Sequence, residues 1–100
     1  MNNKAQVYLM KCAGFYKIGA SSDPNKRLSQ LNNRPFKTEL ITTSIPFDRE
    51  CAYAAESDLL NYCKSYKIGG EWFLLPAEIV EIIKNAIEDK DLPYLYGETE

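Results

Sequence analysis

Apolar and polar residues at the start of the chain follow a pattern typical of a β-hairpin. Val7–Met10 and Phe15–Ala20 are short runs rich in strand-forming residues, and Lys11–Gly14 between them has the composition of a turn. A four-residue turn predicts a register in which Tyr8 lies opposite Lys17, close enough for both to act on one ligand. Because side chains alternate between the faces of a strand, this register predicts two faces, Val7, Leu9, Tyr16 and Ile18 on one, and Tyr8, Met10, Phe15 and Lys17 on the other.

The following segment carries a strong helix-start signal. Asp23 is a favoured N-cap residue, and Pro24 suits the first helical position, so we expect a helix from there to about Leu31. A β-branched, threonine-rich run then predicts a third strand at Leu40–Ser44.

Helical periodicity dominates the second half of the chain. Asp48 can cap a helix that continues to about Tyr66, Glu71–Leu75 predicts a short strand, and Pro76 opens a last helix. The apolar face of the first of these helices contains Ala52, Ala55, Leu59, Leu60 and Cys63, and the inner face of the second contains Ile79, Ile82, Ile83, Ala86 and Ile87.

This order of elements predicts an α+β fold. The sheet is expected to be small, three-stranded and mainly antiparallel, made of the N-terminal β-hairpin plus one strand, and flanked by three helices. One hundred residues fit a single domain, expected over residues 1–90, with an acidic C-terminal tail over residues 91–100.

Composition excludes several classes of function. No apolar run has the length of a membrane span, and Met1–Lys4 lacks the apolar stretch of a signal peptide, so we expect a cytoplasmic protein with no membrane partner. Three cysteines are too few for a disulfide framework, and Cys51 and Cys63 are expected to be small core residues. The absence of histidine excludes His-liganded zinc and imidazole as a general base.

Charge is distributed unevenly along the chain. Residues 1–38 carry seven Lys or Arg and one Asp, whereas residues 39–100 carry five Lys or Arg and thirteen Asp or Glu. A basic N-terminal half can offer a face to phosphates. The alternative is that this half only balances the acidic remainder of the chain.

Glu56 is an anomaly on the apolar face of the first long helix. Ala52 and Ala55 precede it and Leu59 and Leu60 follow it at helical spacing. A carboxylate buried there without a partner would cost several kcal/mol or become neutral. It therefore needs an Arg, a Lys or a metal cation, unless it lies at the edge of the face and extends into water or pairs structurally with Arg27.

Three further residues suggest chemistry without histidine. Arg27 in a first helical turn is unfavourable for the helix dipole, which makes sense if it contacts a phosphate, although a solvated helix residue is the simpler interpretation. Lys17 beside Tyr8 would lower the pKa of the phenol and provide a base.

Trp72 and Phe73 are expected to close the small sheet, with a ligand-binding aromatic pair as the alternative.

In order and spacing these residues resemble the GIY-YIG nuclease superfamily, in particular its small phage-type branch that ends in Gly-Glu-Trp-Phe. The resemblance covers roughly residues 6–75. Val7–Met10 stands at the first motif, with Tyr8 as its tyrosine, and Lys17-Ile18-Gly19 stands at the second, with lysine in place of the usual tyrosine. Arg27 and Glu56 hold the arginine and glutamate positions of the superfamily, and residues 70–73 hold the last motif, Gly-Glu-Trp-Phe.

The resemblance implies a metal-dependent DNA endonuclease that hydrolyses phosphodiester bonds. One divalent cation, Mg²⁺ or Mn²⁺, would be held by Glu56 with waters and phosphate oxygens. Tyr8 would help to deprotonate the attacking water, Arg27 would stabilise the transition state, and Lys17 would assist either step. DNA would be held by the basic N-terminal half, for which the candidate contacts are Lys11, Lys26, Arg34 and Lys37.

Two other functions stay open from the sequence. One is a catalytically impaired nucleic-acid-binding domain of the same fold. The other is a phage or host protein-interaction module that acts against a defence system through its acidic surface. A protein partner that supplies target specificity would also account for the acidic balance and the small size of the chain.

Overall fold

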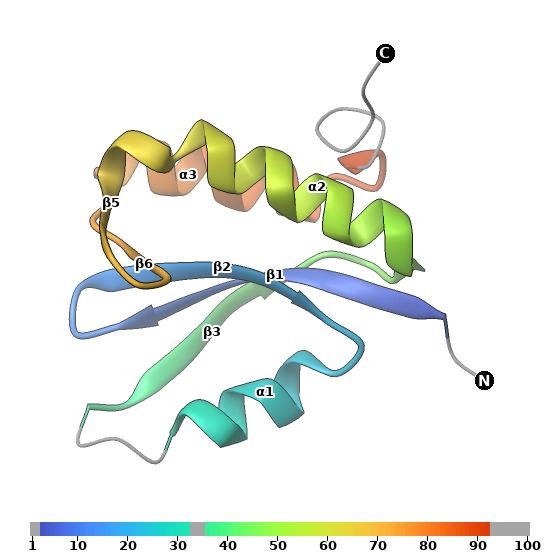
Figure 1. Ribbon diagram of the computed structural model, residues 1–100, viewed down its shortest axis with the longest axis horizontal. Helices are drawn as coiled ribbons and strands as arrows, with labels where there is room; N and C mark the ends of the chain where they lie inside the picture. Colours follow the sequence, from blue (N-terminus) through green and yellow to red (C-terminus); the bar gives the residue numbers. More distant parts are fainter. Residues whose placement is uncertain (1–2, 33–35, 93–100) are drawn as a thin grey trace.

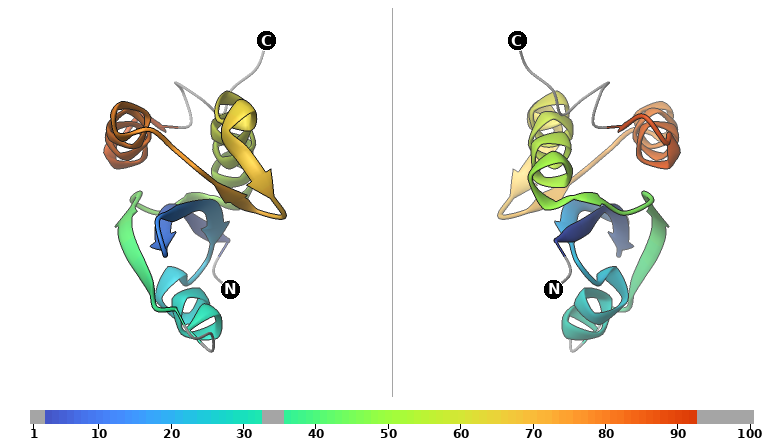
Figure 2. Two further views of the ribbon diagram at one scale, coloured as in Figure 1. Left: turned by 90° about the vertical axis from the view of Figure 1, so that its left-hand side faces the viewer. Right: turned by 90° about the vertical axis from the view of Figure 1, so that its right-hand side faces the viewer.

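The computed structural model describes residues 3–32 and 36–92. Three layers are visible, in which α2 and α3 cover one face of a sheet and α1 covers the other (Figures 1 and 2). The helices are α1 (Pro24–Leu31), α2 (Arg49–Tyr62), a short 3-10 helix η1 (Lys64–Tyr66) and α3 (Ala77–Glu88). The strands are β1 (Lys4–Cys12), β2 (Phe15–Ser21), β3 (Thr38–Thr43), β4 (Phe47–Asp48), β5 (Lys67–Gly69) and β6 (Trp72–Phe73).

The predicted α+β class with three flanking helices is correct, but the expected three-stranded sheet is wrong. The sheet has six antiparallel strands in the order β3-β1-β2-β6-β5, with β4 paired to one end of β1. Of the three additional strands, β6 falls within the stretch predicted at Glu71–Leu75, whereas β4 and β5, two and three residues long, were not predicted. Runs of that length carry no periodic signal in the sequence, because their pairing is decided by the strands beside them.

Strand β1 is central and buried on both faces, which explains its continuous apolar run. Val7 and Leu9 contribute to the core under α2 and α3, while Tyr8 and Met10 are buried on the α1 side. The core also takes the small residues of α2, the inner face of α3 and Leu92. From residue 93 onward, the expected acidic tail lies outside the described residues.

The predicted register of the N-terminal hairpin is wrong by two residues, although the two predicted faces are correct. Met10 pairs with Lys17 and Tyr8 pairs with Gly19, so Tyr8 and Lys17 are diagonal neighbours on one face. The turn is the two residues Ala13 and Gly14, both with positive φ (53° and 86°), rather than four. Two such residues form the tight turn whose twist matches that of the strands.

Helix α1 begins as predicted, whereas other details differ. The Asp23 carboxylate accepts a hydrogen bond from the Lys26 amide at 3.1 Å, and Pro24 follows as the first helical residue. Asp48 precedes α2 but makes no capping bond, since its carboxylate pairs with Lys4 instead.

Cys51 and Ile82, both expected in the core, are exposed. Burial of Cys63 is as predicted, and it raises the pKa of that thiol to about 11.

The edge of β2 is only partly covered. Within the described residues, β6 pairs with β2 at Tyr16 and nowhere further along the strand. Beyond this point the strand continues through Ile18 and Gly19 to Ser21 with no neighbour on its outer side. The uncovered edge therefore leaves space between α1 and α2, which lie on opposite faces of the sheet (Figure 2). In the described part of the chain, no helix is long and apolar enough to cross a membrane.

The hairpin turn gives a prediction about stability. Ala13 adopts φ +53°, which costs an L-residue with a Cβ about 1 kcal/mol, whereas Asn tolerates this region. We expect Ala13→Asn to raise the free energy of unfolding in urea by about 0.5–1 kcal/mol. Ala13→Val is the matched variant and should lower the free energy of unfolding, because a β-branched residue is strongly disfavoured there. A loss of stability in Ala13→Asn would contradict this account.

Candidate functional site

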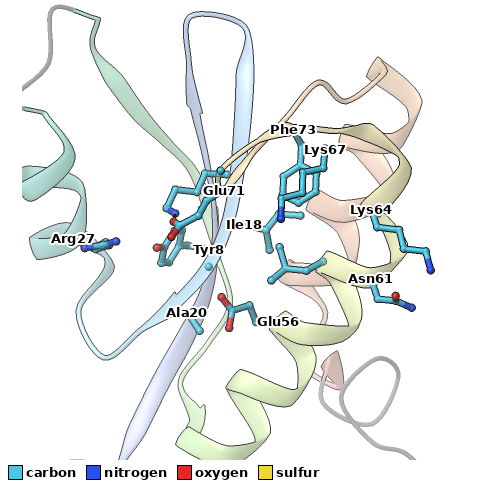
Figure 3. Close-up of a pocket in the computed structure, with 14 residues that line it drawn as sticks. Tyr8, Ile18, Ala20, Arg27, Glu56, Asn61, Lys64, Lys67, Glu71 and Phe73 are labelled. Atoms are coloured by element: carbon cyan, nitrogen blue, oxygen red, sulfur yellow. Dashed lines mark ion pairs between the residues drawn. The ribbon is translucent and has the colours of Figure 1, made fainter.

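A pocket of about 620 Å³ opens beside the uncovered edge of β2. Tyr8, Lys17, Arg27 and Glu56 all line it, although they come from β1, β2, α1 and α2. In Figure 3, Arg27 points in from α1 on one side and Glu56 from α2 on the other, with Tyr8 and Glu71 between them. The four predicted residues thus line one pocket, and their chemical roles stay a prediction.

The position of Tyr8 depends on the glycine opposite it. Tyr8 pairs with Gly19 across β1 and β2, and its ring crosses the glycine Cα. A Cβ built on Gly19 would lie 2.3 Å from the phenol oxygen and 2.4 Å from the ring carbon that bears it. Position 19 therefore requires glycine, because the Tyr8 ring occupies the place of a Cβ. The lack of a side chain lets the buried phenol lie over β2, towards the pocket.

Arg27 is aimed at the pocket by the short connection between β2 and α1. The Ser21 hydroxyl accepts the Asp23 amide at 3.0 Å, and the Arg27 amide donates to the Asp23 carbonyl at 3.1 Å. Its guanidinium donates to the Gln30 side chain at 3.3 Å and also faces the Tyr8 phenol. Because Gln30 leaves most of the five guanidinium donors unoccupied, Arg27 retains donors for an anion.

Glu56 is half-buried on α2 between the fully buried Ala55 and Leu59. Burial raises the pKa of its carboxyl, and the charge of Lys17 opposes that rise. Within the described ranges Glu56 forms neither an ion pair nor a hydrogen bond, so the structural pairing with Arg27 that the sequence allowed is not found. Among the described residues, the Glu56 carboxylate thus has no partner in direct contact, and its oxygens can serve as metal ligands at the pocket.

Lys17 pairs with Glu71 on the turn between β5 and β6. Gly70, at φ +56°, allows this two-residue turn and so brings Glu71 over the buried amine. Burial is the main cause that lowers the pKa of Lys17; the charge of Arg27 lowers it further, while Glu56 opposes the shift. The amine therefore gives up its proton more readily than an ordinary lysine.

The predicted effect of Lys17 on Tyr8 is wrong. The pKa of the phenol is raised, chiefly by burial, and the cation that opposes this rise is Arg27. Lys17 has no such effect, because it lies on the diagonal of the hairpin and pairs with Glu71. Tyr8 consequently keeps its proton at neutral pH and acts as a hydrogen-bonding phenol.

Several residues of the pocket were missed by reasoning from the sequence. Asn61, Lys64 and Lys67 line its outer end beyond Glu56, and Glu71 lines it from the turn (Figure 3). Lys64 lies on η1, two residues beyond the end of α2, so helical spacing from Glu56 does not give its position. The position of Glu71 beside Lys17 was not predictable from the sequence either, because it depends on the conformation of Gly70.

The candidate DNA contacts lie elsewhere. Lys11 is over the Tyr16 ring, 5.7 Å from its centroid, while Lys26 and Lys37 are exposed outside the pocket. Arg34 lies outside the described residues. The cations that do line the pocket are Lys17, Arg27, Lys64 and Lys67.

The donor set limits which metal ion the pocket suits. In the described residues, no group of three or more Cys, Asp or Glu is arranged to hold a metal. Glu56 offers one carboxylate, and the other carboxylate of the pocket, on Glu71, is engaged by Lys17. These residues fit Mg²⁺, which binds through one or two carboxylates and takes its remaining ligands from water and phosphate. They do not fit a cation held by protein ligands alone.

Comparison with known protein families matches residues 3–88 to the T5orf172 domain. This domain is associated with phage proteins of the nuclease type. Neither the curated proteins nor the solved structures gave a match.

The crossing of Tyr8 over Gly19 is testable by a double-mutant cycle. We expect Gly19→Ala to lower the free energy of unfolding by about 1–3 kcal/mol, because its Cβ would overlap the phenol. In a Tyr8→Ala background the same change should cost much less, which gives a coupling energy of about 1 kcal/mol or more. Gly69→Ala is the matched control, since nothing lies within 4 Å of its Cβ position. Equal costs in both backgrounds would refute the crossing.

Glu56 gives a prediction about pH. A carboxyl whose folded pKa is raised favours folding below its unfolded pKa, and this contribution is lost as pH rises through the folded pKa. We therefore expect Glu56→Gln to be more stable than the wild type at about pH 8, with the difference vanishing at about pH 4. Urea unfolding at both values measures this, with Glu81→Gln, exposed on α3, as the control. A difference that grows towards low pH would contradict the burial of this charge.

Proposed function

The chain belongs to the T5orf172 domain family, and we propose that within this family it is a metal-dependent DNA endonuclease of the GIY-YIG type. Matching to a family of phage-type nuclease-like or DNA-binding domains supports nucleic acid as the ligand. The observation that carries the proposal is the convergence of Arg27 and Glu56, from helices on opposite faces of the sheet, on one pocket beside the β2 edge.

Binding of a phosphodiester uses the charges of the pocket in complementary ways. The guanidinium of Arg27 has a planar set of donors that suits phosphate oxygens. Lys64 and Lys67 at the outer end of the pocket can contact neighbouring phosphates of the same strand. Glu56 would repel the phosphate unless a divalent cation lay between them, which is why we propose Mg²⁺ or Mn²⁺ as the cofactor.

Hydrolysis in this pocket needs an activated water and stabilisation of the charge that develops at phosphorus. When bound, the cation would lower the pKa of a coordinated water and neutralise phosphate charge. The Tyr8 phenol, fixed over Gly19, orients the attacking water by a hydrogen bond. Arg27 stabilises the charge on the oxygens of the transition state.

Lys17 is the proposed proton acceptor. Its lowered pKa makes the neutral amine more accessible, as a lysine base requires. The water oxygen forms a bond to phosphorus, the bond from phosphorus to the leaving sugar oxygen breaks, the water proton passes to the neutral amine, and the leaving oxygen takes up a proton from solvent. Lys17 must first part from Glu71 and release its proton to solvent, because only the neutral amine can accept a proton.

A nucleic-acid-binding domain without hydrolysis is the second candidate. It is favoured by the Lys17–Glu71 ion pair, which holds the proposed acceptor in its charged form. Both candidates predict DNA binding, whereas a protein-interaction module predicts none at low salt.

Nicking of supercoiled plasmid separates these functions. With Mg²⁺ or Mn²⁺, we expect Arg27→Ala and Glu56→Ala each to lower the initial rate by about 100-fold or more, since each removes a charge that acts on the transition state. Lys90→Ala is the matched control, because it removes an exposed positive charge after α3 that lies outside the pocket. Equal rates for the wild type and Glu56→Ala would mean that the nicking does not arise at this site. DNA binding without any nicking would establish the second candidate.

A further inference from the structure

A second, apolar pocket of about 540 Å³ lies at one end of the molecule. It forms where the β1–β2 turn, the end of α1, the start of β3 and the β5–β6 hairpin meet, at the left-hand end of Figure 1. Three aromatic residues from separate segments line it, Phe15, Phe36 and Trp72, together with Leu31 and Ile68. Its volume lies within the range typical of ligand sites.

The lining is held in place by contacts within the protein. The side chain of Asn32 accepts the Thr38 amide at 2.7 Å and donates to the Thr38 carbonyl at 3.3 Å. The Cys12 thiol donates to the Phe36 carbonyl at 3.6 Å. Even so, Phe36 is 63% exposed and Ile68 is 52% exposed. These exposed apolar side chains lie around one pocket, on a frame that is already formed.

Two structural elements join this pocket to the polar one. Along the β5–β6 hairpin, Lys67 and Glu71 line the polar pocket while Ile68 and Trp72 line the apolar one. Along β2, Phe15 and Lys17 are on one face, two residues and about 7 Å apart. This separation is comparable to that between successive nucleotides of an extended strand.

We propose that the apolar pocket accepts an unpaired nucleobase of the DNA strand whose phosphate lies in the polar pocket. The inference rests on the proposed function and names its substrate class, which is DNA with single-stranded or extrahelical nucleotides beside the scissile phosphate. Bases stack on aromatic side chains with about 1–3 kcal/mol each, largely without regard to sequence. A fully paired duplex keeps its bases inside and cannot fill the pocket.

The closeness of the two pockets along β2 and the β5–β6 hairpin favours a base over a second copy of the chain. Ile68 of the apolar pocket directly follows Lys67, whose side chain is exposed and lines the polar pocket. A nucleotide satisfies both requirements, because it joins an apolar planar base to an anionic phosphate. An apolar segment of a second copy would satisfy only the first.

The test uses Trp72, the single tryptophan of the chain, as a reporter of stacking. Glu56→Ala protein is titrated at low salt with three dye-labelled DNAs of equal length: a single strand, a fully paired duplex and a strand made of abasic sugar-phosphates. Anisotropy of the dye measures binding, and Trp72 emission measures stacking. We expect all three to bind but only the single strand with bases to quench Trp72. Equal quenching by the abasic strand would overturn the inference.

Affinity provides the second readout. We expect Phe36→Ala to weaken binding of the single strand about tenfold while leaving the duplex within twofold. Leu74→Ala is the matched control, because Leu74 is 55% exposed and lines neither pocket. Trp72 emission that changes on dilution without DNA, together with a dimer in sedimentation, would assign the pocket to self-association and overturn the inference.

Failure of the inference and failure of the proposed function give different results. If the wild type nicks plasmid and Glu56→Ala binds duplex while Trp72 stays unquenched by the single strand, the inference alone fails. If no DNA binds at low salt, the proposed function fails as well.

Discussion

The contact between Tyr8 and Gly19 determines the arrangement of the pocket. Because Gly19 has no side chain, the phenol of Tyr8 lies across β2 towards Arg27. The same crossing fills the space over the glycine on the α1 side of the sheet, where Tyr8 is 3% exposed. Any larger residue at position 19 would displace the ring, and the pocket would lose its central hydrogen-bonding group. The absence of a side chain at Gly19 thus determines both how β1 packs beside β2 and where the phenol lies in the pocket.

Local signals in the sequence were sufficient for some elements and not for others. The cap of α1 was predictable, since Asp23 and Pro24 determine the helix start by themselves. The register of the hairpin was not, because Ala13 gives no sign of the positive φ that the two-residue turn imposes on it. The faces were nevertheless correct, since a shift of two residues in the pairing leaves the alternation of side chains unchanged.

The candidate site was predictable in its members but not in its electrostatics. The resemblance in the order of motifs pointed to Tyr8, Lys17 and Glu56 as one site, yet the pKa directions depend on burial, which a sequence does not report. Burial raises the pKa of both Tyr8 and Glu56 and lowers that of Lys17. In each case loss of hydration outweighs the neighbouring opposite charge. Loss of hydration thus shifts each group towards its neutral form, although Lys17 stays paired with Glu71.

The β5–β6 hairpin has a consequence for how this domain can change during evolution. Its two-residue turn holds Glu71 beside Lys17, and the next residue is the tryptophan of the apolar pocket. An insertion or deletion there would move both at once, because Glu71 lies in the turn and Trp72 follows it directly at the start of β6. The charge of the polar pocket and the shape of the apolar pocket therefore change together during evolution. Relatives with a longer β5–β6 turn are expected to differ in both.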